Sequence, residues 1–131
     1  MTDRSSFWTR SAPYLLSLLR FFTAFLFMEH GAQKLFGLLG GTAVPLFSLI
    51  GLAGVLEFFG GLLILVGLAT RPVAFILSGE MAFAYFMAHA PAAFWPILNH
   101  GGEAILFCFV FLYLSAAGGG PWSVDRLLHR R

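Results

Sequence analysis

The sequence predicts an all-α fold, a four-helix transmembrane bundle with both termini on the cytoplasmic side. Hydrophobic residues make up 59% of the 131 residues and charged residues only 11%, against about 25% charged residues in soluble domains. The apolar residues form four runs of about 18 to 25 residues, each long enough to cross a hydrocarbon core of ~30 Å as a helix. The basic residues outside these runs all lie on one side of the arrangement.

A single domain over residues 1–131 is expected, because the chain is short. Its transmembrane helices are expected at about residues 12–36, 45–68, 72–90 and 99–117. Ser11 is predicted to cap the first helix, with Pro13 in the first turn, and Thr70 to cap the third. Pro91 ends the third, because a residue before proline disfavours helix.

The orientation follows from the basic residues between and beyond the helices. Six of them flank the predicted inner ends: Arg4, Arg10, Arg71, Arg126, Arg130 and Arg131. The opposite loops, 37–44 and 91–99, contain neither lysine nor arginine. This asymmetry places both termini in the cytoplasm. The first helix is too long for a cleaved signal peptide. The lipid bilayer is the expected partner, and the net charge of +2 is too small to indicate nucleic acid.

Each predicted helix carries one glutamate: Glu29, Glu57, Glu80 and Glu103. An ionisable residue at the bilayer centre costs at least ~2.5–3.5 kcal/mol, so each is expected to be functional or paired. Other polar residues lie toward the outer ends: His30, Gln33, Lys34, His89, Asn99 and His100. A rise of 1.5 Å per residue places Glu57 and Glu80 near the midplane and the rest farther out. These residues are therefore expected to line one pocket in the outer half.

Two cations face the four glutamates inside the helices. Lys34 is expected to pair with Glu103, and Arg20 with Glu80 or Glu57. Two carboxyl groups are then left without a cation and are expected to bind a proton or another positive group. Alternatively, the glutamates form an interhelical network that only fixes packing, and Lys34 extends to the outer interface.

Small residues surround Glu57 on its helix, namely Gly54, Gly60 and Gly61. They allow a neighbouring backbone to approach closely, so Glu57 is expected to face protein and not lipid. A metal site is the weaker alternative, because di-metal bundles use Glu-x-x-His on two helices. Here Glu29 is adjacent to His30 and the other motif is reversed, so the metal stays unassigned. The one cysteine, Cys108, excludes an intrachain disulfide and a CxxC motif.

Three stretches resemble the DoxX family of bacterial membrane proteins. The first helix ends in His30-Gly-Ala-Gln-Lys34-Leu-Phe-Gly, the second contains Glu57-Phe-Phe-Gly-Gly followed by a Thr-Arg turn, and the fourth opens on His100-Gly-Gly-Glu103. The match covers nearly the whole chain. The resemblance implies a four-helix protein of the bacterial inner membrane. The family is named for a subunit associated with thiosulfate:quinone oxidoreductase, and some members are thought to join membrane redox complexes.

The leading hypothesis is therefore a quinone-linked subunit of a membrane oxidoreductase with a phenylalanine-lined pocket. The expected catalytic residues are His30, Glu57 and Glu103. The expected ligand-binding residues are Glu29, Gln33, Lys34, Glu80 and His100. A quinone is the favoured ligand, and because the chain has no flavin, CxxC or haem-attachment motif, a protein partner or a further cofactor must supply electrons. The alternatives are a non-catalytic assembly or binding protein of a redox complex and a small-solute or proton-coupled transporter, which would have to form a homo-oligomer.

Overall fold

The computed structural model describes residues 6–129, and every regular element in that range is helical. The elements in chain order are α1 (Ser6–Phe36), α2 (Leu49–Val55), η1 (Leu56–Gly60), α3 (Gly61–Val66), α4 (Thr70–Ala84), η2 (Tyr85–His89), α5 (Pro96–Asn99), α6 (Gly102–Ala117) and α7 (Val124–Leu128). η1 and η2 are π-helical turns that continue α2 and α4 without a break. The predicted all-α class is confirmed.

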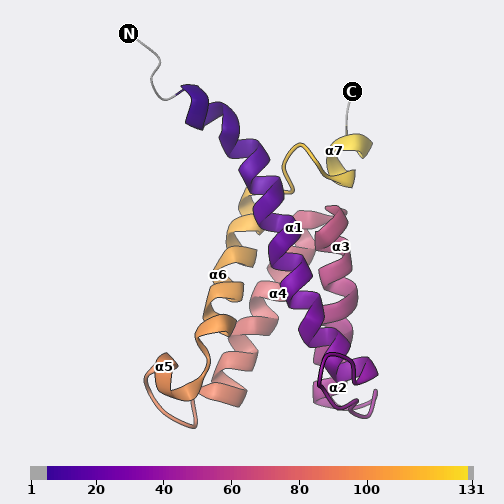
Figure 1. The fold of residues 1–131 in the computed structure, drawn as a ribbon, viewed down its shortest axis with the longest axis vertical. Helices are drawn as coiled ribbons and strands as arrows, with labels where there is room; N and C mark the ends of the chain where they lie inside the picture. Colours follow the sequence, from indigo (N-terminus) through magenta and orange to yellow (C-terminus); the bar gives the residue numbers. More distant parts are fainter. Residues whose placement is uncertain (1–5, 130–131) are drawn as a thin grey trace.

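Two helix pairs build the molecule (Figure 1). α1 packs along α2, η1 and α3, while α4 packs along α6. The pairs lie close together at the end that carries α7 and diverge toward the end that carries α5 and the start of α2. The core between them is apolar, with Phe27, Ile64, Leu77, Phe111 and Leu114 almost fully buried.

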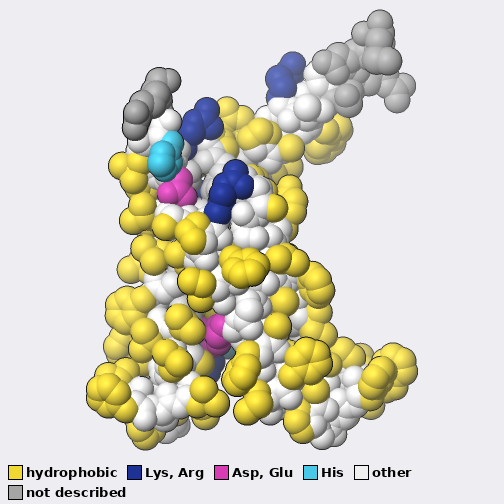
Figure 2. Space-filling view, turned by 180° about the vertical axis from the view of Figure 1, so that it is seen from behind, with side chains coloured by type: hydrophobic (Ala, Val, Ile, Leu, Met, Phe, Trp, Pro, Cys, Tyr) yellow, Lys and Arg dark blue, Asp and Glu magenta, His cyan; other side chains and the backbone are white. Residues whose placement is uncertain are grey.

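Two helical segments are long and apolar enough to cross a membrane: α1, and the continuous run Leu49–Val66. α6 is apolar but has only 16 residues, which is about 24 Å of helix. Figure 2 shows hydrophobic side chains over most of the lower part of one face, with an acidic and a basic patch visible among them, while most of the lysine and arginine lies toward the upper end. That end also carries α7 and the first turns of α1.

Several helix starts differ from the predicted ones. α1 begins at Ser6, six residues before the expected start, and Pro13 lies inside it. Ser11 is not a cap, because its hydroxyl donates to the Phe7 carbonyl (2.7 Å), as serine does inside a helix. α2 begins at Leu49 and not at residue 45, because Ser48 accepts a hydrogen bond from the Gly51 N–H and caps the helix.

The segment before α6 also differs from the prediction of one helix from residue 99. A separate short helix, α5, ends at Asn99, and α6 begins at Gly102. Asn99 is buried and holds this loop together: its amide donates to the Tyr85 hydroxyl and the Ala93 carbonyl, and its carbonyl oxygen accepts from the Gly101 N–H. The turn is made by His100, which has a left-handed backbone.

Arg20 lies at the end of the core nearest the segment before α7 and is almost fully buried. Its guanidinium donates to the carbonyl oxygens of Gly119, Trp122 (2.9 Å) and Leu65 (3.3 Å). Ser17, one turn earlier, donates to the same Gly119 carbonyl and accepts from the Trp122 N–H. The predicted pairing of Arg20 with a glutamate is therefore wrong, because the segment after α6 folds back over α1 and supplies nearer acceptors.

The start of α4 is capped from a distant part of the sequence. Asp125 accepts hydrogen bonds from the N–H groups of Ala69 (2.7 Å) and Thr70 (2.9 Å), and its own N–H donates to the Gly67 carbonyl (2.8 Å). Thr70, the expected cap, is instead the first residue of the helix. The negative carboxylate is favourable there, because a helix N-terminus carries partial positive charge.

This cap predicts a pH-dependent contribution to stability. Burial raises the pKa of the Asp125 carboxyl group, but the hydrogen bonds from Thr70 and Ala69 outweigh it and hold the pKa below its ordinary value. A carboxyl group whose pKa is lowered by folding stabilises the protein above its unfolded pKa of ~3.9, and the contribution is lost as the pH falls. Thermal unfolding in detergent between about pH 6 and pH 3 is expected to show a larger loss for the wild type than for Asp125→Asn. An equal loss of thermal stability with falling pH in the wild type and in Asp125→Asn would refute the role of Asp125 as a cap.

Candidate functional site

A cavity of about 870 Å³ lies between the diverging helix pairs, in the half of the molecule that carries α5. Its wall is mostly apolar, with phenylalanine, leucine and methionine side chains from α1, α2, α4 and α6. Seven polar side chains reach the same cavity: His30, Lys34, Glu57, Glu80, His89, His100 and Glu103. The structure thus brings together six of the eight predicted site residues, and adds His89.

Close packing of α1 against η1 positions the first polar pair. A Cβ atom on Gly31 would collide with the backbone N of Phe58 and the carbonyl oxygen of Gly54, so only glycine permits this approach. One turn later, the Lys34 ammonium lies 2.6 Å from Glu57 Oε1. Glu57 exposes only 2% of its surface, as expected for a residue that faces protein. π-Turns such as η1, which carries Glu57, often occur at functional sites.

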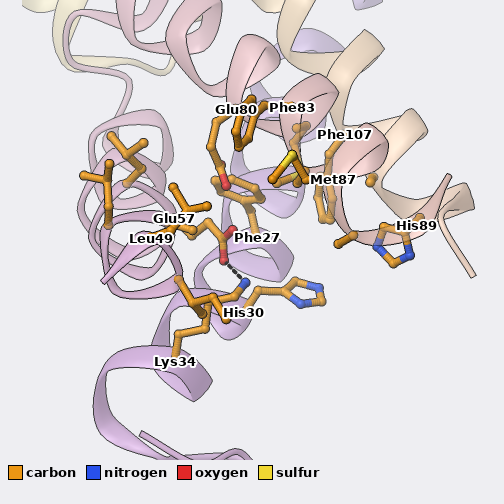
Figure 3. A pocket seen from close by; sticks show the side chains of 18 of the residues that line it. Phe27, His30, Lys34, Leu49, Glu57, Glu80, Phe83, Met87, His89 and Phe107 are labelled. Atoms are coloured by element: carbon orange, nitrogen blue, oxygen red, sulfur yellow. Dashed lines mark hydrogen bonds and ion pairs between the residues drawn. The ribbon is translucent and has the colours of Figure 1, made fainter. Parts of the chain in front are cut away.

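Glu80 reaches the cavity from α4, and its carboxyl group points toward that of Glu57 (Figure 3). Its Oε1 is buried and has no hydrogen-bond partner among residues 6–129. A buried carboxyl oxygen without a partner costs free energy. It is therefore the polar atom of the cavity wall that a ligand would stabilise most directly.

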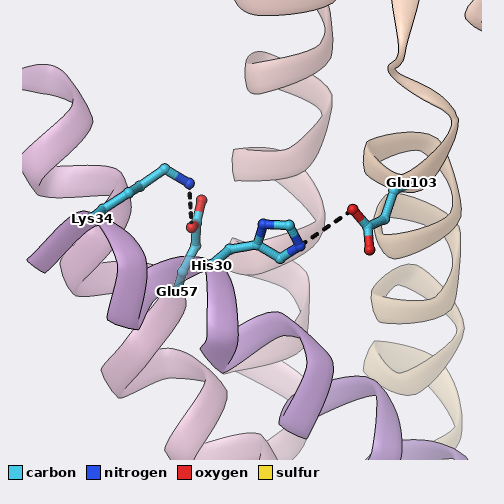
Figure 4. Close-up of polar contacts among 4 residues, drawn as sticks. All are labelled: His30, Lys34, Glu57 and Glu103. Atoms are coloured by element: carbon cyan, nitrogen blue, oxygen red, sulfur yellow. Dashed lines mark hydrogen bonds and ion pairs between the residues drawn. The ribbon is translucent and has the colours of Figure 1, made fainter. Parts of the chain in front are cut away.

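A second polar pair joins α1 to α6. His30 Nε2 is 3.2 Å from Glu103 Oε1, and both side chains are substantially exposed (Figure 4). The expected Lys34–Glu103 pair is therefore wrong: Lys34 binds Glu57, and His30 takes the glutamate of α6. Depth along the helices placed Lys34 and Glu103 at similar heights, but α1 packs mainly on α2 and η1, so Lys34 meets the second helix.

Two histidines line the cavity near α5. His89 hydrogen-bonds through Nδ1 to the Asn99 carbonyl (2.9 Å) and stacks on Tyr85. His100 lines the cavity from the turn between α5 and α6. The sequence placed His89 and Asn99 in the same polar group, but it did not indicate that Tyr85 and Asn99 hold the His89 ring in place.

Two predicted site residues lie outside the cavity. Glu29 does not line it, although it shares a helix turn with His30. Gln33 instead donates through Nε2 to the Leu39 carbonyl (2.9 Å) and so fastens the loop after α1. Both lie on sides of α1 other than the one that carries His30 and Lys34, because neighbouring helical residues point about 100° apart.

No group of three or more His, Cys, Asp or Glu side chains within residues 6–129 is arranged to hold a metal ion. Cys108 is a half-buried free thiol in α6 that packs on the core and lies 3.5 Å from Ser78 Oγ. The chemistry of the cavity therefore rests on carboxyl, ammonium and imidazole groups in an apolar wall. Such groups can exchange protons and hydrogen bonds with the polar part of a ligand, while the apolar wall contacts the rest of that ligand.

Comparison with known proteins gives the family. The DoxX family pattern matches residues 15–90. A protein of Haemophilus influenzae that is named only as uncharacterized is 37% identical over 126 residues, covering 91% of this chain and 94% of the relative. Inner membrane protein YqjF of Escherichia coli is 33% identical over 118 residues, covering 81% of this chain and 85% of the relative.

No solved structure matches the chain significantly. The family match nevertheless covers more than half of the sequence and includes His30, Lys34 and Glu57 of the cavity. Two helical segments of the chain are long and apolar enough to span a bilayer. This chain is therefore a membrane protein of the DoxX family.

Proposed function

We propose that the protein is the quinone-binding subunit of a membrane redox complex and that the cavity holds the quinone head group. The observation that carries the proposal is the ion pair between the buried Glu57 and the half-buried Lys34, in a mostly apolar cavity of about 870 Å³. A quinone head group has two carbonyl acceptors on an apolar ring. The Lys34 ammonium is a donor fixed in place by Glu57, and Phe27 and Phe107 provide an aromatic wall beside it.

Reduction of a quinone to a quinol consumes two electrons and two protons. Glu57, His30 and Glu103 are the groups we assign to proton transfer, because they connect the depth of the cavity to its exposed outer rim. The electrons come from a partner protein, since the chain carries no flavin, CxxC or haem-attachment motif. The protein's own part is to bind and orient the head group and to supply protons.

We further propose that the chain spans the inner membrane four times with both termini in the cytoplasm. The start of α1 and α7 lie at the same end of the molecule, which requires an even number of crossings. Arg10, Arg71 and Arg126 belong to the elements that meet at this end, in agreement with the rule that basic residues stay inside. The cavity then opens toward the outer side.

Binding of decylubiquinone tests the proposed function. The protein in lipid nanodiscs is expected to bind it, and Glu57→Gln is expected to raise the Kd about tenfold, because Lys34 loses the charge that holds it in place. Glu29→Gln is the matched control: it makes the same change on the neighbouring helix, outside the cavity, and should leave the Kd unchanged. Absence of binding by the wild type, or equal affinity in Glu57→Gln, would contradict the proposal.

A further inference from the structure

One side of the cavity wall also forms the outer surface of the protein. Leu49 on α2 and Phe83 and Met87 on α4 and η2 line the cavity, yet each exposes more than half of its surface. A residue can do both only at the edge of an opening. The opening lies between α2 and α4, on the flank of the molecule that the bilayer would cover.

The two helices present matching stripes along this opening. Leu49, Ala53 and Glu57 follow one another at four-residue spacing, which places them on one side of their helix. Glu80 and Ala84 do the same on α4, which runs back after the turn at residues 67–69. All five residues line the cavity. The small alanines therefore lie between the exposed edge and the glutamates on both helices.

The chemistry changes along this path from apolar to acidic. Residues 35–56 and 81–88 contain no charged side chain, so the edge of the opening is compatible with lipid. At the inner end, Glu80 Oε1 is buried without a hydrogen-bond partner in residues 6–129, whereas the Lys34 ammonium is already bound to Glu57. A carboxyl oxygen can accept a hydrogen bond in either protonation state. An O–H or N–H donor on a ligand can therefore supply the partner that this oxygen lacks.

We propose that the ligand enters the cavity sideways from the bilayer, between α2 and α4, and that its head group donates a hydrogen bond to Glu80. The ligand class is a lipid-borne molecule with an apolar body and an O–H or N–H head group. This inference rests on the cavity being a binding site, as proposed above. To the proposed function it adds the direction from which the ligand enters. It also predicts that the cavity prefers the quinol, which has hydroxyl donors, over the quinone, which has only carbonyl acceptors.

Nitroxide accessibility tests the sideways opening without any ligand. A spin label is attached to Ala84→Cys, or to Ala53→Cys as a second variant, in full-length protein that carries Cys108→Ala and is reconstituted in liposomes. Collisions with lipid-soluble oxygen are expected to be frequent, and collisions with a water-soluble nickel chelate rare. Frequent collisions with nickel would show an aqueous opening. Protection from both reagents would show that another chain covers the opening. Either result would overturn the proposal.

A label at Phe75→Cys is the matched control for this measurement. Phe75 is exposed on α4 but does not line the cavity. Saturating decylubiquinol is expected to lower oxygen collisions at position 84 and to leave position 75 unchanged. An equal change at the two positions would mean that decylubiquinol dissolves in the bilayer without occupying the opening.

The hydrogen bond to Glu80 is tested with two probes of similar shape. Decylubiquinol has two hydroxyl donors, whereas its dimethyl ether has none. The wild type is expected to bind the quinol about tenfold more tightly, and Glu80→Leu is expected to remove this preference. Equal binding of both probes by the wild type would refute the donor requirement while leaving the binding function intact. If neither probe bound, the proposed function itself would fail, and the accessibility measurement would still report on the opening.

Discussion

Replacing Lys34 with methionine is expected to destabilise the protein by about 3–5 kcal/mol, because the change leaves a buried carboxylate without its cation. Glu57 is 2% exposed and lies 2.6 Å from the Lys34 ammonium. Nothing else within residues 6–129 forms an ion pair with Glu57. The free energy of unfolding in mixed micelles, measured at neutral pH, checks this expectation.

A double variant separates the lost charge from lost packing. Lys34→Met combined with Glu57→Gln is expected to recover most of the stability, because the uncompensated charge is gone. His30→Gln is the control on the same helix. Its partner Glu103 is largely exposed, so its loss should cost less than about 1 kcal/mol. A double variant as unstable as Lys34→Met alone would show that the methionine disturbs packing and that the ion pair is not responsible.

Replacing Arg20 with methionine is expected to cost at least about 3 kcal/mol. The guanidinium donates to three carbonyl oxygens, two of them in the segment that follows α6, and a hydrogen bond from a charged group contributes about 1.5–3 kcal/mol. The variant should also expose this segment, residues 118–123, to added protease. Unfolding measurements and limited proteolysis in detergent check both effects.

Arg10→Met is the matched control for this change. Arg10 lies on the same helix, but its side chain is exposed, so its replacement should leave the stability and the proteolysis pattern close to those of the wild type. Similar effects in the two variants would mean that Arg20 acts through its positive charge at the α7 end of the molecule and not through its hydrogen bonds. They would contradict a specific role in fastening the C-terminal segment to α1.

The gathering of polar residues in one half of the molecule was predictable because helix rise alone fixes the position of a side chain along its helix. Glu57, Glu80, His30 and Glu103 do line one cavity, and the glycines around Glu57 do contact other elements: Gly61 faces α1 and Gly60 faces α4. The partners within the cavity were not predictable. Depth says how high a side chain lies but not which neighbouring helix it faces, so Lys34 was assigned to Glu103 when it binds Glu57.

Contacts between residues distant in sequence were the other source of error. The cap of α4 is Asp125, which lies 55 residues beyond Thr70, and the partners of Arg20 include carbonyls about 100 residues away. Backbone carbonyls occur at every position, so no sequence pattern distinguishes the ones that a buried arginine will bind. The helix caps were predicted from neighbouring residues only, and they failed where the chain folds back on itself.

The sequence by itself determined the helical class, the membrane setting and six of the eight candidate residues that line the cavity. These follow from composition, periodicity and the cost of charge in an apolar medium, which depend on local residues alone. The tertiary structure decided which glutamate pairs with Lys34 and which with His30, and which glutamate keeps an oxygen without a partner among residues 6–129. Those features depend on how two helix pairs pack, and packing is set by contacts such as Gly31 on Phe58 that join distant parts of the chain.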